Sequence, residues 1–331
     1  MSLRKLGEGK TLTLEESYSL ALSMLKGELG DVEIAAALTA MRVRGEAPEE
    51  VAGFAKAARD TCVKVDIGAL PAIDTAGTGG DGQRTINLST AAALVASALG
   101  AYVLKHGNRS VTSATGSADF LEALGYNINL KPDEAVAALR TSRFAFLFAP
   151  AYHPTFARVA PIRKRLPFRT IFNIVGPLAN PGQVKRQVIG VAEPRLVPVV
   201  ANAAAYLGLE HALVIHGEPG VDEASPEGRT IVAEVRGGKV EEYELTPEDF
   251  GAKRWRIPRA DAREESVAKT LGGLRGEDAE AANAIAMNAA LALYVAGLAK
   301  DPRDGYEAAL EAIKSGRVAQ HVELVVKASR R

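Results

Sequence analysis

Apolar positions in the first 65 residues follow the spacing of amphipathic helices. Thr13 and Glu16 have the spacing of a capping box and predict where a first helix begins. Asp31 is expected to cap a second helix, and Pro48 to stand in the first turn of a third, because Pro has no N–H that would be left unpaired there. No alternating strand pattern interrupts this stretch, so we expect a small helical domain.

From residue 70 onward, short apolar runs alternate with helical stretches. The expected strands are Ala72–Ala76, Ala101–Leu104, Phe144–Phe148, Val188–Val191 and Ala212–Ile215, and the expected helices between them include Leu88–Leu99 and Gly116–Leu124. A polar hairpin is expected over Thr230–Val235 and Val240–Leu245, followed by helices to the end. This order predicts an α/β protein: a small N-terminal helical domain plus a large α/β domain with a mainly parallel central sheet covered by helices.

Charge and composition narrow the classes of partner. The 331 residues include 40 Lys and Arg and 40 Asp and Glu, so the net charge is zero and any anion site must be local. We therefore expect neither nucleic acid nor a membrane as a partner. The uncharged stretch from Ala281 to Ala299 is interpreted as a buried helix, since it is Ala-rich and contains two asparagines. A single cysteine, Cys62, excludes an intrachain disulfide, and the N-terminus resembles no signal peptide, so we expect a cytoplasmic protein.

A glycine-rich loop follows the first expected strand. Its sequence is Gly77-Thr78-Gly79-Gly80-Asp81-Gly82, and the next helix begins near Asn87-Leu88-Ser89-Thr90. Such a loop lets backbone N–H groups converge on a phosphate at a helix N-terminus. The spacing matches neither a Walker loop nor a dinucleotide fingerprint. A tight turn before a capped helix is the structural alternative.

A second loop with anion-binding chemistry follows the next expected strand. It has the sequence Lys105-His106-Gly107-Asn108-Arg109-Ser110-Val111-Thr112-Ser113, in which Lys and Arg supply charge. Both loops would lie beyond the carboxyl ends of strands, where open α/β sheets bind ligands. A solvated charged turn is the alternative, but two such loops make it less favourable.

A pair of adjacent carboxylates, Asp222 and Glu223, follows the apolar run that ends at Ile215. Carboxylate oxygens together with substrate phosphates are ligands that Mg²⁺ prefers. Acidic pairs are often only solvated surface. Beside two phosphate loops, however, this pair predicts a Mg²⁺ site.

Together these motifs resemble those of the anthranilate phosphoribosyltransferase family. The resemblance also covers Arg169-Thr170-Ile171-Phe172-Asn173 and Gly176-Pro177-Leu178-Ala179-Asn180-Pro181, and it runs in order from the N-terminal helices to at least residue 230. It implies a nucleoside-phosphorylase-like fold with a helical domain of residues 1–68, joined by a segment of roughly 165–182, and an α/β phosphoribosyl-transfer domain of residues 69–331. It also implies a homodimer formed through the helical domain.

The activity implied by the resemblance is transfer of phosphoribosyl from 5-phosphoribosyl 1-pyrophosphate (PRPP) to anthranilate, in tryptophan biosynthesis. By motif match, the residues implied at the PRPP site are Gly77, Gly80, Asp81, Thr85, Asn87, Leu88, Ser89, Thr90, Lys105, His106, Gly107, Asn108, Arg109, Ser110, Val111, Thr112, Ser113 and Ser117. Those implied at the anthranilate site are Gly77, Asn108 and Arg163, with Arg163 opposite the carboxylate. Mg²⁺ would be held by Ser89, Asp222 and Glu223.

Two positions depart from the family pattern. Ala114 stands where the family usually has Lys, so one positive charge is missing beside the phosphate loop, and Val221 replaces a common Leu before the acidic pair. The first is expected to alter PRPP affinity. Neither changes the interpretation.

The role of His106 and two other functions stay open at this stage. His106 could accept the amine proton as a catalytic base, or only shape the pocket. A pyrimidine-nucleoside phosphorylase would share the fold but would have little use for the Asp222–Glu223 pair. A non-catalytic nucleic-acid-binding paralogue would require a basic surface, whereas this chain is neutral.

Overall fold

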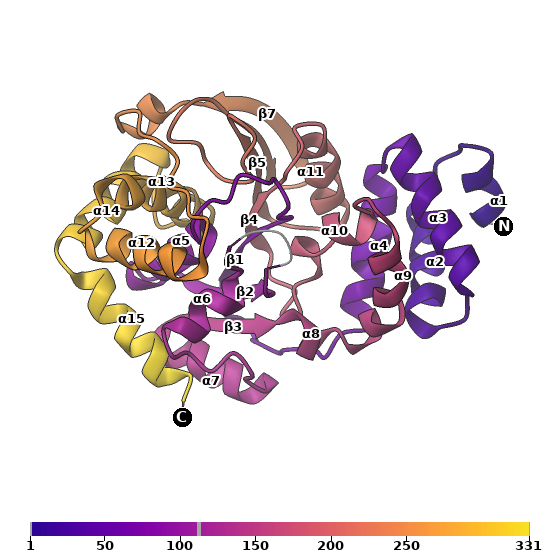
Figure 1. The fold of residues 1–331 in the computed structure, drawn as a ribbon, viewed down its shortest axis with the longest axis horizontal. Coiled ribbons are helices and arrows are strands. Elements are labelled where there is room, and N and C mark those ends of the chain that lie inside the picture. Colours follow the sequence, from indigo (N-terminus) through magenta and orange to yellow (C-terminus); the bar gives the residue numbers. More distant parts are fainter. Residues whose placement is uncertain (1, 111–113, 331) are drawn as a thin grey trace.

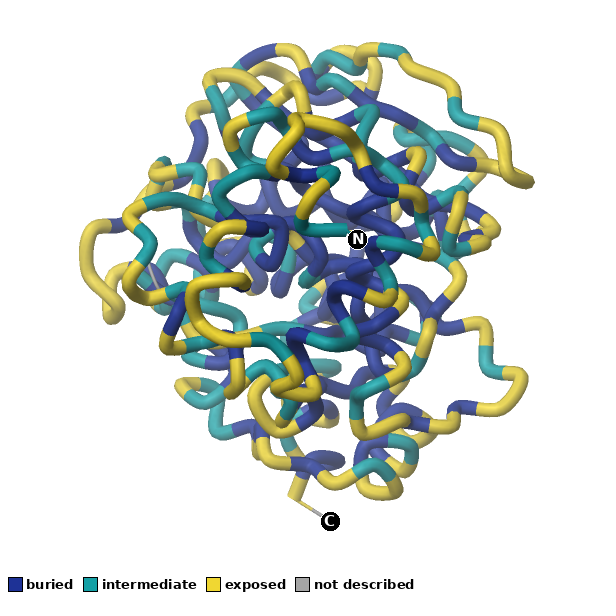
Figure 2. Tube along the Cα trace, turned by 90° about the vertical axis from the view of Figure 1, so that its right-hand side faces the viewer, coloured by how far each residue is buried: buried dark blue, intermediate teal, exposed yellow. Residues whose placement is uncertain are grey.

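The molecule has a helical lobe and a larger α/β lobe (Figure 1). The computed structural model describes residues 2–110 and 114–330. The N-terminal helices form the lobe at the right of the view, and the sheet with its covering helices forms the lobe at the left. Buried segments run through the interior of the molecule, while exposed residues concentrate in its outer loops and helix faces (Figure 2).

The predicted helical region is confirmed. Its helices are α1 (Ser2–Gly7), α2 (Leu14–Lys26), α3 (Asp31–Arg44) and α4 (Pro48–Asp60). Thr13 caps α2 in a capping box with Glu16, as expected. The cap predicted for α3 is wrong: Gly30 is the N-cap and its N–H donates to the Glu33 carboxylate at 2.8 Å, so Asp31 is already the first helical residue. There its negative charge still suits the positive end of the helix dipole.

Seven strands form one sheet in the order β3-β2-β1-β4-β5-β6-β7. Their bounds are β1 Ala72–Gly77, β2 Tyr102–Gly107, β3 Phe144–Phe148, β4 Arg186–Gly190, β5 His211–Gly217, β6 Thr230–Arg236 and β7 Lys239–Leu245. The first five pair in parallel, and β6 and β7 add an antiparallel hairpin at one edge. The mainly parallel sheet and the hairpin are therefore confirmed.

Helices cover both faces of the sheet. The longer ones are α5 (Leu88–Ala98), α6 (Ser117–Ala123), α7 (Pro132–Ser142), α11 (Leu196–Tyr206), α12 (Arg263–Arg275), α13 (Ala279–Ala296), α14 (Pro302–Lys314) and α15 (Arg317–Ala328). The short ones are α8 (Ala149–Tyr152), η1 (Pro154–Arg158), α9 (Ala160–Arg165), α10 (Ile171–Ile174), η2 (Pro177–Ala179) and η3 (Pro247–Phe250). Among the residues that the structure describes, α13 is the one helix long and apolar enough to span a membrane. It is 78 % buried inside the protein, as expected for a core helix.

Two hydrophobic clusters lie on opposite faces of the sheet. Along β5, Leu213 and Ile215 pack with α5 and α13, whereas Ala212 and Val214 pack with α11 and the helical lobe. Alternate side chains of a strand point to opposite faces, so one strand serves both clusters. The second cluster also contains Ile171 and Phe172, which brings the chain after residue 165 onto the helices of the N-terminal lobe.

Candidate active site

The strand order places the candidate site beside β1 and β4. From β1 the chain moves through β2 to β3 on one side, and later through β4 to β5 on the other. Such a reversal leaves a crevice beyond the carboxyl ends of the two central strands, which is where open α/β sheets bind ligands. The glycine-rich loop begins at the last residue of β1, and the acidic pair follows β5. β2 is longer than expected and includes Lys105, His106 and Gly107, so only the rest of the basic loop follows that strand. All three predicted loops therefore meet at one edge.

Glycines end the four central strands and let these loops approach one another. β1, β2, β4 and β5 end at Gly77, Gly107, Gly190 and Gly217. A Cβ at Gly77 would lie 2.3 Å from Asp222 Oδ2, and one at Gly190 would lie 1.7 Å from the Asp222 carbonyl oxygen. Both distances are far below van der Waals contact, so only glycine permits the acidic loop to sit directly against these strand ends.

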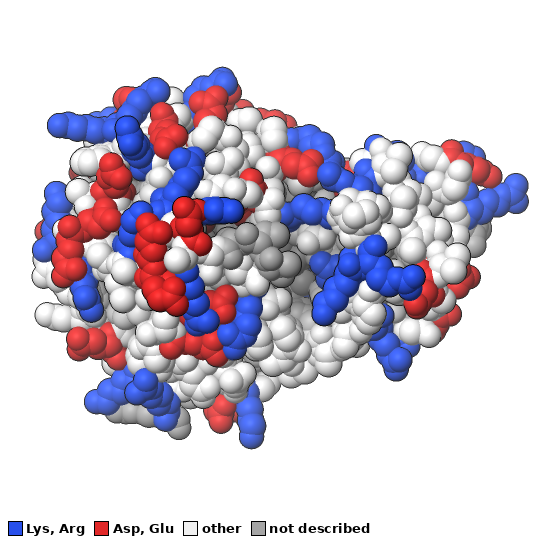
Figure 3. All heavy atoms as spheres, in the orientation of Figure 1, with Lys and Arg blue, Asp and Glu red and all other residues white. Residues whose placement is uncertain are grey.

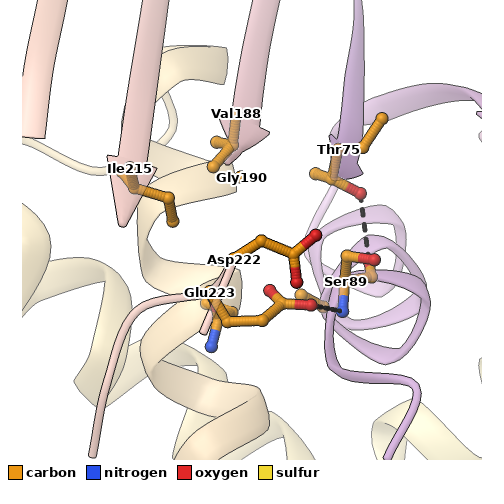
Figure 4. Close-up of a pocket in the computed structure, with 10 residues that line it drawn as sticks. Thr75, Ser89, Val188, Gly190, Ile215, Asp222 and Glu223 are labelled. Carbon is orange, nitrogen blue, oxygen red and sulfur yellow. Dashed lines mark hydrogen bonds between the residues drawn. The ribbon is translucent and has the colours of Figure 1, made fainter. Parts of the chain in front are cut away.

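The acidic pair is buried and faces the start of α5. Asp222 accepts a hydrogen bond from the Gly79 N–H at 2.8 Å, and Glu223 Oε1 accepts one from the Ser89 N–H at 3.1 Å. Both carboxylates point toward Ser89 beneath the strand ends (Figure 4). Burial, and then the nearby Asp81 carboxylate, raises the pKa of Asp222; burial and Asp222 raise that of Glu223. The site is therefore short of positive charge.

The donor set at this point fits a cation that also binds a substrate. The acidic pair and Ser89 line a cavity of about 10 Å³, close to the size of a single water or ion. The described residues contain no group of three or more His, Cys, Asp or Glu side chains placed to hold a metal by themselves. Two carboxylates and a hydroxyl form an incomplete shell of hard oxygen ligands. Mg²⁺ typically completes such a shell with substrate phosphates and water.

A buried layer of polar groups lies under the acidic pair. Lys105 Nζ donates to the Thr75 carbonyl oxygen and lies 3.4 Å from Ser89 Oγ. Asp74 accepts hydrogen bonds from Asn180 Nδ2 at 2.8 Å and from the His106 N–H at 3.3 Å. Burial raises the pKa of Asp74 to about 6 and lowers that of Lys105, with each charge partly offsetting the effect on the other. Lys105 thus supplies the buried positive charge between Asp74 and the acidic pair.

The basic loop is anchored on α6. Asp119 accepts hydrogen bonds from the Ser110 and Gly116 N–H groups at 3.0 and 2.9 Å. The Arg109 guanidinium forms ion pairs with Asp119 at 3.2 Å and with Glu122. Arg109 was predicted to bind PRPP, but in this conformation its guanidinium is paired with two carboxylates. Val111, Thr112 and Ser113 lie outside the described residues.

Other predicted PRPP residues connect the loops to each other. Asn87 Nδ2 donates to the Thr115 carbonyl oxygen at 3.2 Å, and Thr115 Oγ1 donates to Asn87 Oδ1 at 2.8 Å. Ser117 Oγ donates to the Asn108 carbonyl oxygen at 3.1 Å, and Thr85 pairs with Arg259 in an isolated β-bridge. The remaining members follow in the same loops: Gly80 and Asp81 precede α5, and the side chains of Leu88 and Thr90 are buried within its first turn.

An aromatic wall runs from the basic loop toward the helical lobe. The His106 and His153 ring centroids lie 5.0 Å apart, and the Phe156 ring centroid lies 5.0 Å from that of His153. Phe156 in turn contacts Phe172 at 5.5 Å. Burial lowers the pKa of His106 to about 3 and that of His153 to about 4, so both rings are neutral at pH 7. This wall is suited to an uncharged ring.

Two arginines stand beside the aromatic wall. The Arg163 guanidinium lies 5.5 Å from the Phe172 ring centroid, and it has no carboxylate partner among the described residues. Burial and the neighbouring Arg169 lower its pKa. Arg169 donates to the carbonyl oxygens of Thr78, at 2.7 Å, and Gly79. Arg169 therefore connects the glycine-rich loop to the helical side, while Arg163 has its charge free for a ligand. Figure 3 shows basic side chains flanking the hollow between the two lobes.

Sequence reasoning assigned no role to several of these residues. Arg169 and Asn180 stand in the quoted motifs, which was the signal available for them. His153 and Phe156 carry no such signal, because a histidine before a proline in an ordinary stretch predicts no ligand. They join the site only because η1 packs near α2 and brings their rings against His106 and Phe172.

Comparison with known proteins agrees with this geometry. The glycosyl transferase family α/β domain matches residues 69–319, and its helical bundle domain matches residues 2–62. The anthranilate phosphoribosyltransferase of Pyrobaculum arsenaticum is 62 % identical over 328 residues, covering 99 % of this chain and 98 % of the relative. The crystal structure of the Thermus thermophilus enzyme of the same name is similar with a TM-score of 0.93 at 39 % identity, over 100 % of this chain and 99 % of that one.

The anthranilate phosphoribosyltransferase of Saccharomyces cerevisiae is a more distant neighbour with ligands. Its complex with PRPP and Mg has a TM-score of 0.83 at 29 % identity, over 96 % of this chain and 92 % of that one. Its complex with 4-fluoroanthranilate has a TM-score of 0.86 at 27 % identity, over 99 % and 96 %. Full-length identity, both domain matches and the shared fold agree, and this chain belongs to the anthranilate phosphoribosyltransferase family.

Proposed function

We propose that this protein transfers the phosphoribosyl group of PRPP to the amine of anthranilate, giving N-(5-phosphoribosyl)anthranilate and pyrophosphate in tryptophan biosynthesis. The observation that carries the proposal is the meeting of two unlike halves at one sheet edge. One half combines phosphate-type loops with a buried acidic pair, and the other is a neutral aromatic wall beside Arg163. A polyphosphate and an aromatic acid are the ligands that such halves would select.

PRPP would lie over the glycine-rich and basic loops. Gly77, Gly80 and Asp81 would line the first loop, and the start of α5 at Asn87–Thr90 would present N–H groups to phosphate oxygens. Lys105 to Ser113 and Ser117 would complete the site. Glycosyl transfer of this kind develops positive charge on ribose and negative charge on the departing pyrophosphate. Positioning and electrostatic stabilisation by these fixed groups would therefore supply most of the rate enhancement.

Ser89, Asp222 and Glu223 would hold Mg²⁺. Three observations support this assignment: all the donor atoms are oxygens, the cavity has the size of an ion, and the pKa of both carboxyls is raised. Each of them favours a bound cation. When bound, Mg²⁺ supplies charge neutralisation on the departing pyrophosphate. The charge of Lys105 would favour the ionised form of Glu223, because it opposes the rise of the Glu223 pKa.

Anthranilate would bind against the aromatic wall, with Arg163 opposite its carboxylate and Gly77 and Asn108 on the side of the PRPP loops. Its aromatic amine is already neutral near pH 7 and needs no strong base. His106 is a weak base because burial lowers its pKa to about 3. This favours the pocket-shaping role for His106 over that of catalytic proton acceptor.

The protein would act as a cytoplasmic homodimer joined through the helical domain of residues 1–68. Val32 and Val43 on α3 support this, since each is 82 % exposed although apolar. The packing of Ile171 and Phe172 on the N-terminal helices supports adding the segment 165–182 to that domain. Sedimentation of the parent and of Val43→Asp tests the dimer, which the charge should weaken if α3 lies in the interface.

The first experiment mixes the protein with PRPP, Mg²⁺ and anthranilate and follows the loss of anthranilate fluorescence. Loss that requires both PRPP and Mg²⁺ is the expected result. If fluorescence stays constant while calorimetry detects PRPP binding, the acceptor is another molecule and the proposal fails at that point. If PRPP does not bind either, the phosphoribosyl donor is wrong.

A further inference from the structure

A large hollow lies away from the candidate active site, between α6, α12 and α15. Its volume is about 710 Å³, within the range of 300–1,000 Å³ that is typical of small-molecule sites. In Figure 1 these three helices lie at the lower left, on the side opposite the helical lobe. None of its lining residues belongs to the phosphate loops, the acidic pair or the aromatic wall. We call this hollow the α12–α15 groove.

The walls of the groove are apolar. Leu124, Leu271, Leu274, Val322 and Val326 line it, and four of these five are only partly buried. They belong to the edge of the main hydrophobic cluster, so the groove is an extension of the core that opens to the surface. A flat or ring-shaped apolar body would bury these side chains further, and each Å² of apolar surface removed from water would contribute roughly 25 cal/mol.

The rim of the groove is cationic. Arg275, Lys327 and Arg330 line it against a single lining carboxylate, Glu323. Arg275 and Lys327 form no ion pair with any described residue, and Arg330 Nε donates to the Gly125 carbonyl oxygen at 2.9 Å. Figure 3 shows basic side chains gathered where α15 ends. On a chain with zero net charge, this local excess is distinctive.

We propose that the α12–α15 groove binds a small amphipathic anion: an aromatic or similarly flat apolar body carrying one carboxylate or sulfonate group. The apolar walls would take the body, and Arg275 and Lys327 would take the charge. Neither an uncharged hydrocarbon nor a cation would use both features. The proposal about binding is independent of the proposed enzymatic function.

The helices that form the groove also hold the phosphate loops. On α12, Thr270 directly precedes Leu271, and Ser266 lies one turn before Thr270. Thr270 Oγ1 accepts from the Asn87 N–H at 3.3 Å, and Ser266 Oγ lies 2.6 Å from Thr115 Oγ1. At the N-terminal end of α6, the Asp119 carboxylate accepts hydrogen bonds from the Ser110 and Gly116 N–H groups. A ligand in the groove would therefore bias the position of both loops, and PRPP would bias the groove equally. This coupling, unlike the binding itself, rests on the proposed function.

The binding test uses the full chain and 8-anilino-1-naphthalenesulfonate, whose fluorescence rises in an apolar site. We expect saturable binding and weaker binding of the uncharged N-phenyl-1-naphthylamine. Arg275→Glu with Lys327→Glu should lower the affinity for the sulfonate about tenfold, since two attractive charges become repulsive. The matched control, Lys253→Glu with Lys300→Glu, makes the same charge change at exposed positions elsewhere and should leave the affinity unchanged.

A second variant separates loss of the site from loss of the fold. Ala319→Trp places a large ring in the groove without changing charge, and it should also abolish sulfonate binding while the far-ultraviolet circular dichroism stays that of the parent. Equal affinity in the groove variants and the parent would overturn the proposal, as would equal loss in the groove and control pairs.

The coupling test measures sulfonate affinity with and without saturating PRPP and Mg²⁺. We expect a change of about fivefold, with PRPP affinity changed by the same factor when the sulfonate saturates the groove. Unchanged affinity in both directions would overturn the coupling and leave the binding site standing. If PRPP itself fails to bind, the proposed function is what has failed, and the groove variants still decide the binding proposal.

Discussion

The two halves of the candidate site hold their ligand-facing groups by opposite means. In the phosphate half, strands β1 and β2 and the loop after β5 bring Asp74, Lys105, Asp222 and Glu223 into a dense network of charge and backbone hydrogen bonds. In the aromatic half, neutral rings in contact with one another lead to one half-buried arginine. The first half is built for an ion with several charges, and the second for a flat ring with one.

This difference also sets how each half responds to solvent and metal. Burial raises the pKa of the acids in the phosphate half and lowers that of the histidines in the aromatic half. The buried carboxylates thus destabilise the phosphate half when no cation is bound, whereas the neutral rings of the aromatic half need no cation. Binding of a metal and a polyphosphate would offset the unfavourable burial of these carboxylates. We therefore expect variants of the phosphate half to affect PRPP and variants of the aromatic half to affect anthranilate.

The largest expected effect comes from removing the acidic pair. Asp222→Asn with Glu223→Gln should lower kcat about a hundredfold and raise the Mg²⁺ concentration for half-maximal activity, because carboxylate ligands hold the cation. Fluorescence assays across a Mg²⁺ titration measure both. Glu241→Gln with Glu242→Gln is the matched control, another adjacent acidic pair but on the exposed edge strand β7. An unchanged Mg²⁺ titration in the Asp222 and Glu223 variant would remove both residues from the metal site.

A smaller effect should be confined to the aromatic half. Arg163→Ala is expected to raise KM for anthranilate about thirtyfold, equivalent to roughly 2 kcal/mol for a lost charged contact, with little change in KM for PRPP. Steady-state kinetics with each substrate varied in turn give the two values. Arg165→Ala, two positions along α9 and exposed, is the control. Equal shifts for both substrates would contradict the assignment of Arg163 to the anthranilate carboxylate.

The two halves should also respond to pH with opposite sign. Asp222 and Glu223 have raised pKa values, so the folded state binds more protons than the unfolded state, and stability falls as pH rises from about 4 through those raised values. His153 has its pKa lowered to about 4, so stability falls as pH drops from about 6.5 toward 4.

Urea unfolding at several pH values without Mg²⁺ separates the two contributions. Relative to the parent, Asp222→Asn with Glu223→Gln should gain about 1 kcal/mol at pH 8, and His153→Phe should gain a similar amount near pH 5. Adding Mg²⁺ with PRPP at pH 8 should stabilise the parent more than the acidic-pair variant. If both variants changed stability by the same amount at every pH, the opposed titration of the two halves would be wrong.

The smallest effect concerns the charge missing from the phosphate half. Ala114→Lys restores the family's usual lysine and should lower KM for PRPP about threefold, because one partly exposed charge contributes little in water. Ala114→Met lengthens the side chain without charge and should not. The gain should also shrink as salt is raised. A threefold gain with Met as well would assign the effect to packing.

Most of the phosphate half could be predicted from the sequence because its residues are local. Gly77 to Gly82 and Lys105 to Ser113 are continuous runs that begin in the last residues of a strand, and Asn87 to Thr90 begins the next helix; the strands themselves follow from alternating apolar runs and helices. Parallel strands place their carboxyl ends at one edge, so three separate motifs point to one place before any coordinates are known. The N-cap of α3 was misplaced by one residue, because Gly30 takes the cap position and its N–H is satisfied by the Glu33 carboxylate.

The tertiary structure alone decided the aromatic half and the partners of the charges. His106, the neighbouring pair His153 and Phe156, and Phe172 come from separate parts of the chain, and only the packing of η1 and α10 against the helical lobe brings their rings together. In the same way, Arg109 has the sequence context of a phosphate ligand but is paired with Asp119 and Glu122 across α6. Local spacing fixes which groups a loop or helix presents. Long-range packing determines which of them meet, since burial and charge neutralisation depend on neighbours from other elements.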